Sequence, residues 1–394
     1  MKIALCTDSF FPTMGGTEYV VDIFARKLIS DEHGNNEVAI FTQDFCKNNE
    51  SDKERPYKIY RTKSTHVPIF NENICAPKRD KNFAKEFLDF NPDIVHIHTP
   101  LMLGSWAVDM AKQINVKSIL TVHTRFAFAY DLYTPFSKNN FIHRKIVNSL
   151  LKDCRHSCTN ADILTTVSAS SKENEIKKAY GVNRDILVMH NGFDIPKLEI
   201  DNNYFENNND KNKLSIVYAG RIDITKNLDF SFYVIKGLVD RNIPLEFYLA
   251  GEGIRKKHLD KLAEKLGISD KIKWLGRLSQ NELFLLHSKS DVFLFPSIFD
   301  NDSIAAIEAR FCGCPTVCIK DTGTSERIVD GVNGYTADDN PDSFVPIIEN
   351  IYKLKQNNYS EYLKLRQSTR DMLPETWDQV VEKYRKMYQE NARK

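Results

Sequence analysis

Two cations lie five residues apart in a segment typical of the turn between a strand and a helix. Arg221 and Lys226 follow Gly220, between an apolar run ending at Ala219 and a helical pattern that begins near Asn227. Two fixed cations at the carboxyl end of a strand suit a diphosphate, whose negative charge is spread over several oxygens. Arginine and lysine are also common on any protein surface, so an ordinary exposed turn is the alternative interpretation.

A second run places acids around the start of a helix. An apolar strand is followed by a loop that carries Asp300, and a helix is expected from Ser303 to Cys312. The backbone N–H groups of Ser303 and Ile304 would lie at the N-terminus of that helix, where phosphate binds readily. Glu308 lies one to two turns inside an otherwise apolar helix, and a buried acid needs a partner such as a ribose hydroxyl.

Two groups of potential metal ligands are present. Asp300 and Asp302 form a D-x-D pattern, and Cys154, His156 and Cys158 lie close together. Neighbouring acids in a loop are common, and the two cations could neutralise a diphosphate without a metal. The cysteines lack a second ligand pair at zinc spacing, so a helix with two half-buried thiols is the favoured interpretation. We therefore expect no metal and no other cofactor.

A glycine pair follows the first apolar run of the chain. Gly15 and Gly16 lie in the loop Phe11–Glu18, directly before an expected helix at Thr17–Ser30. Glycine lets a backbone approach a phosphate closely, and a helix N-terminus supplies N–H groups and a positive dipole end. A plain tight turn explains the pair equally well.

Strand-like and helix-like runs alternate in two stretches and must position these residues. This alternation indicates an α/β fold with two doubly wound parallel sheets, in which ligands bind at the carboxyl ends of the strands. The first domain is expected over 1–196, with strands at Lys2–Cys6, Glu37–Thr42, Ile94–His98, Ser118–His123, Asp162–Val167 and Ile186–His190.

A stretch rich in Asp and Asn interrupts the pattern at 197–213 and is expected to be a linker between domains. The second domain is expected over 214–376. A final amphipathic helix is expected from Trp377 to Gln389. The second set of strands is expected at Ser215–Tyr218, Leu245–Leu249, Ile272–Leu275, Val292–Phe295 and Thr316–Ile319.

Bulk properties narrow the class of protein. The chain has 394 residues and a formal net charge of +1, so no overall field favours a nucleic-acid partner. Its eight cysteines form no C-x-x-C pair. The N-terminus does not resemble a signal peptide, and no apolar run reaches the roughly 18 residues of a membrane span, so a cytoplasmic location is expected.

Taken together, these motifs resemble the GT-B glycosyltransferases of the large retaining family four. The resemblance covers essentially the whole chain, and its elements appear in the family's order. They are the Gly15–Gly16 loop, Pro92–His98, His123–Thr124, Asn191–Asp194, Gly220–Asn227, Ala250–Gly253, Gly276–Leu278, Asp300 with Glu308, Cys312–Pro315 and Glu326–Gly334.

The resemblance implies two Rossmann-like domains facing each other across a cleft, with a nucleotide-sugar donor held mainly by the second domain. Arg221 and Lys226 would clamp the donor diphosphate, and Glu308 would bind the ribose. Asp300 and the backbone at Asp302–Ile304 would hold the transferred sugar and its phosphate.

Further positions receive roles from the same resemblance. Gly15 and Gly16 would bring backbone N–H groups to the phosphate, and His123 would contact the sugar near the reacting carbon. The backbone near Arg277 and Leu278 would meet the base. The C-terminal helix, over 377–394, would cross back onto the first domain.

The implied reaction is transfer of a hexose with retention of configuration, most simply from UDP-glucose or a related UDP-hexose, without a metal. The family usually has Glu followed by a Phe-Gly-like pair where this chain has Asp300, Asn301 and Asp302, which leaves the donor sugar open. A non-catalytic nucleotide-sugar-binding partner subunit of a glycosyltransferase complex is the alternative, against which the intact Arg221, Lys226 and Glu308 argue.

The acceptor is expected to be a glycan or a lipid. The segment 136–160 combines apolar and basic residues, a pattern that suits either a core-facing helix with a solvated basic face or peripheral contact with the inner face of a membrane. His123–Phe126, followed by Tyr130 and Tyr133, resembles in part the acceptor region of diacylglycerol glucosyltransferases.

Overall fold

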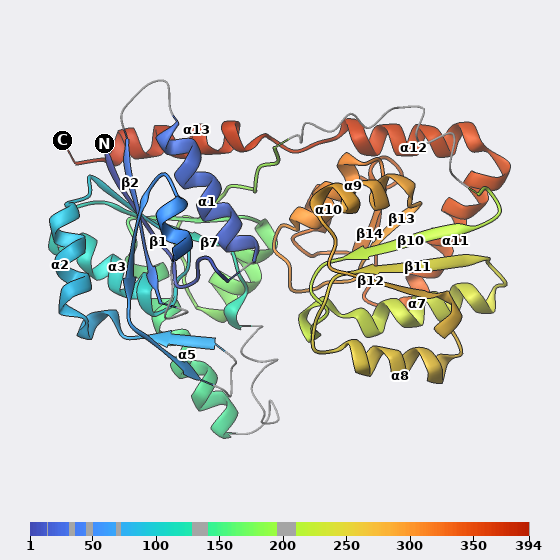
Figure 1. The fold of residues 1–394 in the computed structure, drawn as a ribbon, viewed down its shortest axis with the longest axis horizontal. Coiled ribbons are helices and arrows are strands. Elements are labelled where there is room, and N and C mark those ends of the chain that lie inside the picture. Colours follow the sequence, from blue (N-terminus) through green and yellow to red (C-terminus); the bar gives the residue numbers. More distant parts are fainter. Residues whose placement is uncertain are drawn as a thin grey trace. The chain divides into compact units, whose positions relative to one another are not determined.

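The computed structural model describes residues 1–13, 15–30, 36–44, 50–67, 72–127, 141–194 and 210–393. The chain forms two compact units: unit 1 consists of Met1–Gly192 and Glu375–Lys394, and unit 2 consists of Phe193–Pro374. Each unit has its own parallel sheet with helices packed against it (Figure 1). Of the linker expected at 197–213, residues 197–209 lie outside the described part of the chain, and the first strand of unit 2 begins at Leu214.

The sheet of unit 1 is parallel throughout, in the order β3-β2-β1-β6-β7-β8-β9. β6, which pairs with β1, and β7, which pairs with β6, are buried along their whole length, as expected for a sheet covered on both faces. The strands are β1 (Lys2–Cys6), β2 (Glu37–Gln43), β3 (Lys58–Thr62), β6 (Ile94–Ile97), β7 (Ser118–Val122), β8 (Ile163–Thr166) and β9 (Leu187–Val188).

Helices bury their apolar faces against this sheet. α2, for example, buries Phe83, Phe87 and Phe90, and the Asp80 side chain caps its N-terminus by accepting from the Phe83 N–H. A short antiparallel pair, β4 (Ser64–Val67) with β5 (Glu72–Cys75), lies outside the main sheet. The helices are α1 (Gly16–Ile29), α2 (Lys81–Phe90), α3 (Met102–Gln113), α5 (Phe141–Asn160), the π-helix η3 (Ser171–Ala179) and α13 (Trp377–Asn391).

The last helix of the chain, α13, belongs to unit 1 and packs beside α1, where the N- and C-termini lie close together (Figure 1). The ring of Tyr384 lies 5.1 Å from that of Phe24 on α1, and Trp377 lies 6.1 Å from the same ring. Gly192 passes directly under the start of α13, where a Cβ atom would lie 2.6 Å from the Trp377 backbone. A larger residue would therefore displace the helix.

Unit 2 contains a six-stranded parallel sheet in the order β12-β11-β10-β13-β14-β15. The two strands at its centre, β10 and β13, consist almost entirely of buried apolar residues. The strands are β10 (Leu214–Ala219), β11 (Leu245–Ala250), β12 (Ile272–Gly276), β13 (Val292–Phe295), β14 (Thr316–Ile319) and β15 (Gly334–Ala337). The helices are α7 (Leu228–Asp240), α8 (Lys256–Leu266), α9 (Gln280–Lys289), α10 (Ile304–Phe311), α11 (Pro341–Asn357) and α12 (Tyr359–Asp371).

The doubly wound α/β class expected from the sequence is confirmed, and the strands at Val292–Phe295 and Thr316–Ile319 occupy the residues expected for them. The strand expected over Ile186–His190 is too long. β9 comprises only Leu187–Val188, whose side chains are exposed. It is the edge strand of the sheet, so it pairs on one side only, and edge strands are often short.

Candidate active site

The loops at the carboxyl edge of the unit 2 sheet carry the residues expected to bind the donor. Two of these loops, one after β10 and one after β13, are tied together by hydrogen bonds. Asn227 Nδ2 donates to the Pro296 carbonyl over 3.2 Å, and Ser297 Oγ donates to the Thr225 carbonyl over 3.3 Å. Sequence-distant polar groups therefore meet at the strand ends where ligands bind in this fold.

Lys226 and Asp300 form an ion pair between these two loops. Lys226 Nζ lies 2.7 and 2.8 Å from the two carboxylate oxygens of Asp300, and Ser297 Oγ donates to the same carboxylate over 2.5 Å. Burial alone would raise the pKa of Asp300, but the Lys226 charge and the two side-chain hydrogen bonds hold it below its usual range. Asp300 is therefore ionised at neutral pH.

The other expected cation, Arg221, lies at the rim of the same edge. Its side chain is 63% exposed, and its Nε lies 3.4 Å from Asp223, whose carboxylate also caps the short turn Ile224–Lys226. Two neighbouring loops approach at backbone level here: a Cβ atom on Gly251 would lie 1.9 Å from the Gly220 carbonyl oxygen. Only glycine fits at position 251.

The start of α10 is arranged as expected from the sequence. Ser303 is its N-cap residue and accepts from the Ala306 N–H, which leaves the first N–H groups of the helix, including that of Ile304, at the strand-end edge. The Asp302 side chain turns away into the interior, where it pairs with Arg327 over 2.7 Å.

The groups expected at the ribose and the base lie on neighbouring elements. Burial raises the pKa of Glu308, and Gln280 Nε2, which donates to its Oε1 over 3.3 Å, opposes that rise. Arg277 is exposed and Leu278 is half-buried, directly after β12. These positions therefore follow two different strands of one sheet, β12 and β13.

The glycine pair of unit 1 has two different surroundings. A Cβ atom on Gly15 would lie 2.5 Å from the Glu18 carboxylate, which accepts from Ser9 Oγ, whereas a Cβ atom on Gly16 would meet nothing within 4 Å. A side chain at position 15 would therefore require the Glu18 carboxylate to shift. The expected phosphate contact of this loop stays a prediction.

His123 directly follows β7 in unit 1, and its Nε2 lies 3.1 Å from Nδ1 of His98. Burial lowers the pKa of His123 to about 4, so the imidazole is neutral at physiological pH. His98 is fully buried. It is a residue that we did not single out from the sequence, although its place two residues after His96, within the run Pro92–His98, puts both rings on one face of the sheet.

The possible metal ligands have other partners. Asp300 pairs with Lys226 and Asp302 with Arg327. Cys154 and Cys158, expected to be half-buried, are fully buried because α5 packs this face onto the unit 1 core. His156 faces Asp109, with 2.7 Å between Nε2 and Oδ1, and no group of three or more potential ligands is gathered anywhere in the described residues.

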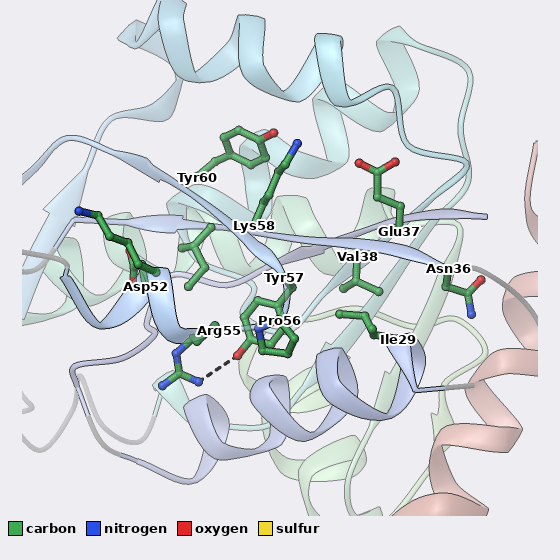
Figure 2. Close-up of a pocket in the computed structure, with 12 residues that line it drawn as sticks. Ile29, Asn36, Glu37, Val38, Asp52, Arg55, Pro56, Tyr57, Lys58 and Tyr60 are labelled. Atoms are coloured by element: carbon green, nitrogen blue, oxygen red, sulfur yellow. Dashed lines mark hydrogen bonds between the residues drawn. The ribbon is translucent and has the colours of Figure 1, made fainter. Parts of the chain in front are cut away.

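A cavity of about 930 Å³ lies in unit 1, beside β3 and the beginning of β2 (Figure 2). Arg55 donates to the Tyr57 hydroxyl at its wall. None of the expected site residues lines it, and β2 contributes its amino end, whereas ligands of parallel sheets bind at carboxyl ends. The lining residues are Ile29, Asn36, Glu37, Val38, Asp52, Lys53, Arg55, Pro56, Tyr57, Lys58, Ile59 and Tyr60.

Two family models match consecutive parts of the chain. The glycosyltransferase family 4 model matches residues 14–197, and the model for glycosyl transferases group 1 matches residues 199–371. The gpi3 subunit of phosphatidylinositol N-acetylglucosaminyltransferase from Schizosaccharomyces pombe is 22% identical over 400 residues, which cover 98% of this chain and 79% of that protein.

Two further proteins are similar over most of the chain. The alpha-monoglucosyldiacylglycerol synthase of Streptococcus pneumoniae is 22% identical, over 80% of this chain and 70% of that protein. The crystal structure of Anabaena HepE in complex with UDP superposes with a TM-score of 0.73 at 15% identity, covering 99% of this chain and all of that one, which shows a shared fold. The chain therefore belongs to glycosyltransferase family 4 and is a nucleotide-sugar-dependent glycosyltransferase with the GT-B fold.

Proposed function

We propose that this glycosyltransferase transfers a hexose from a UDP-sugar, with UDP-glucose or a related UDP-hexose as donor, and retains the configuration of the anomeric carbon. The observation that carries the proposal is the Lys226–Asp300 ion pair at the carboxyl edge of the unit 2 sheet. Lys226 and the exposed Arg221 would neutralise the leaving diphosphate, and the ionised Asp300 would accept hydrogen bonds from sugar hydroxyls.

Retention is proposed from the setting of Asp300. Its carboxylate is already held by Lys226 and Ser297, a geometry that suits hydrogen bonding to the sugar better than nucleophilic attack. We infer a front-face reaction. The bond between the anomeric carbon and the diphosphate breaks, the acceptor hydroxyl attacks the same face, and the leaving phosphate takes the proton of that hydroxyl. No metal enters this scheme.

A lipid or lipid-linked acceptor is proposed from two of the relatives. One is named as acting on phosphatidylinositol and the other as a synthase of glucosyldiacylglycerol. On α5, Val147 and Leu151 face the core, whereas Lys145 and Lys152 are exposed and Phe141 is 65% exposed. This basic face could meet an anionic membrane. Residues 136–140 of the expected segment lie outside the described residues, and no helix in the described part of the chain could span a bilayer.

The test is nucleotide release from UDP-, GDP- and ADP-hexoses, first without acceptor and then with anionic vesicles that contain diacylglycerol. Slow hydrolysis of a UDP-hexose, accelerated by the vesicles, is the expected result. Release from a GDP- or ADP-sugar alone would overturn the UDP assignment. Lack of acceleration by vesicles, with acceleration by a glycan acceptor, would overturn the lipid assignment.

Lys226→Ala tests the donor site itself. Loss of the ammonium group leaves the diphosphate charge uncompensated, so turnover should fall by about 10²-fold or more. Lys236→Ala is the matched control, because Lys236 lies on α7 of the same unit and pairs with Asp240 at the surface. Near-normal turnover of Lys226→Ala, with UDP-hexose still hydrolysed by the wild type, would contradict the placement of the donor at this edge.

A further inference from the structure

Four aromatic rings form a column through unit 1, from the C-terminal helix to His123. The ring of Tyr384 on α13 lies 4.9 Å from that of His96, and His96 lies 4.0 Å from His98. His98 lies 5.3 Å from His123, with only 14° between the two planes. The inner rings of the column are fully buried, so their polar atoms need hydrogen-bond partners within the protein.

The two inner histidines differ in how well their ring nitrogens are satisfied. His96 Nδ1 contacts the Tyr388 hydroxyl, and its Nε2 lies 2.7 Å from Thr121 Oγ1. His98 uses Nδ1 for the contact of 3.1 Å with His123, whereas its buried Nε2 has no hydrogen-bond partner among the described residues. Burying an unsatisfied polar atom costs free energy, so His98 is a poor choice for stability alone.

The unsatisfied atom fixes the direction of the hydrogen bond between the two rings. If His98 accepted at Nδ1, its proton would lie on Nε2 and would be a buried donor without an acceptor. Orphaned buried N–H groups are rarer than under-used acceptors. His98 therefore carries its proton on Nδ1 and donates it to Nε2 of His123, and the neutral His123 ring then carries its own proton on Nδ1.

We propose that His98 is a positioning residue for glycosyl transfer, which holds the His123 ring in one orientation and in the Nδ1–H tautomer. This inference rests on the proposed role of His123 at the sugar, near the reacting carbon. In that tautomer the His123 ring is uncharged, and its N–H lies on the side of the ring away from His98. Such a fixed donor is useful only if its orientation does not fluctuate, since small misplacements at a reacting centre are costly.

Two variants separate the hydrogen bond from the stacking. His98→Phe keeps an aromatic ring in the column but removes the donor and the unsatisfied Nε2. His98→Asn removes the ring but can place an amide N–H near the position of Nδ1. His287→Phe is the matched control: His287 is a fully buried histidine of unit 2, and both its ring nitrogens lack partners among the described residues.

The experiment measures the melting temperature, the kcat with a UDP-hexose, and the tautomer of His123. The tautomer is read by NMR of protein labelled with 15N-histidine. The His123 signals are identified because they disappear in His123→Gln. For His98→Phe we expect an unchanged or higher melting temperature, loss of the single Nδ1–H tautomer, and a kcat roughly 10- to 100-fold lower. His98→Asn should recover most of the kcat and the tautomer, and His287→Phe should alter neither.

Three results would overturn the proposal in different ways. An Nδ1–H tautomer that persists in His98→Phe would show that His98 does not set it. A changed tautomer with an unchanged kcat would show that the tautomer does not serve the reaction. A fall in kcat that tracks a lower melting temperature in every variant would indicate a structural role. If the wild type used no donor, the proposed function would fail, whereas the tautomer measurement would still decide the pairing of the two rings.

Discussion

Asp8 is a single buried carboxyl group at the end of β1 in a setting that penalises its charge. Its side chain accepts from the Leu103 N–H over 2.9 Å and from Thr99 Oγ1 over 2.7 Å. Burial nevertheless outweighs these hydrogen bonds and raises its pKa from 3.8 to about 6. The carboxyl group thus joins the β1 loop to α3, and its burial costs less free energy when it is protonated.

Asp8→Asn should make stability less dependent on pH. Because the pKa of Asp8 is higher in the folded protein than in the unfolded chain, its contribution is fully present below about pH 4 and is lost as the pH rises through about 6. At about 1.4 kcal/mol per pKa unit the loss is about 3 kcal/mol. In urea unfolding from pH 4 to pH 8, the free energy of unfolding of Asp8→Asn should therefore rise relative to that of the wild type.

Asp109→Asn is the control with the opposite sign. Lys78 and His156 outweigh burial and lower the pKa of Asp109, so its contribution is present above about pH 4 and is lost on acidification. This variant should lose stability relative to the wild type as the pH rises towards about 4, and the difference should stay nearly constant at higher pH. A difference between Asp8→Asn and the wild type that stays constant from pH 4 to pH 8 would show that Asp8 has no raised pKa.

The sequence indicated which residues gather at the carboxyl edge of the unit 2 sheet better than it indicated the partners of those residues. The rule that ligands bind at strand ends brings Lys226 and Asp300 together, although they lie 74 residues apart. It does not say which side a loop residue faces. The Asp302 side chain is buried and pairs with Arg327, whereas Asp300, two residues earlier, pairs with Lys226. Arg327 and His98 lie in the motif runs Glu326–Gly334 and Pro92–His98, but neither of them was assigned a role of its own from the sequence.

At the scale of elements, the loop before α10 is held from both sides. Asp300 pairs with Lys226 on one side and Asp302 with Arg327 on the other. Between them the Asn301 backbone lies so close to Gly323 that a Cβ atom there would be 1.8 Å from the Asn301 carbonyl oxygen. The position of the α10 N-terminus therefore depends on the loop after β14.

Arg327→Met should weaken donor binding as well as the fold. Removing the cation leaves the buried Asp302 carboxylate without its salt-bridge partner, which costs about 3–5 kcal/mol when a buried pair is broken. Because the same loop positions the α10 N–H groups, the KM for the donor should rise about 10-fold, a change of about 1.4 kcal/mol. Donor titrations and urea unfolding of the same samples measure the two effects.

Lys355→Met is the matched control for this ion pair. Lys355 and Asp291 form another buried ion pair of unit 2, with 2.9 Å between the charged atoms. This pair joins α11 to the start of β13 and lies outside the loops expected to bind the donor. The control should lose a similar amount of stability while its donor KM stays within about twofold. Equal changes in KM for the two variants would show that the Arg327 effect is one of stability alone.

The α/β elements were predictable where their patterns are strong, and less so elsewhere. Continuous apolar runs such as Val292–Phe295 are unambiguous. Helix α10 was expected to be one residue longer at each end, because its cap residues, Ser303 and Cys312, also fit a helical pattern. β3 and β15 were not expected. Both are half-buried strands with polar residues, so they lack the continuous apolar run that marks the central strands.

At the scale of the whole molecule, each unit has a hydrophobic core of its own, and the last helix of the chain completes the core of the first unit. Tyr384 is central to this closure. Its ring packs against Phe24 and His96, and its hydroxyl lies 3.1 Å from both Thr121 and Thr165. One side chain from α13 thus joins α1, β6, β7 and β8.

Tyr384→Leu should therefore loosen unit 1 and leave unit 2 unchanged. The variant loses ring packing and two hydrogen bonds in a buried site, a cost of about 3 kcal/mol. Amide hydrogen exchange, read by mass spectrometry, should accelerate in α13, β6 and β7 but not in β10 or α7. Tyr352→Leu is the reciprocal control, because Tyr352 is buried in unit 2 and donates to the Asn212 carbonyl. If amide exchange accelerated in both units in either variant, the conclusion that each unit has its own closed core would be contradicted.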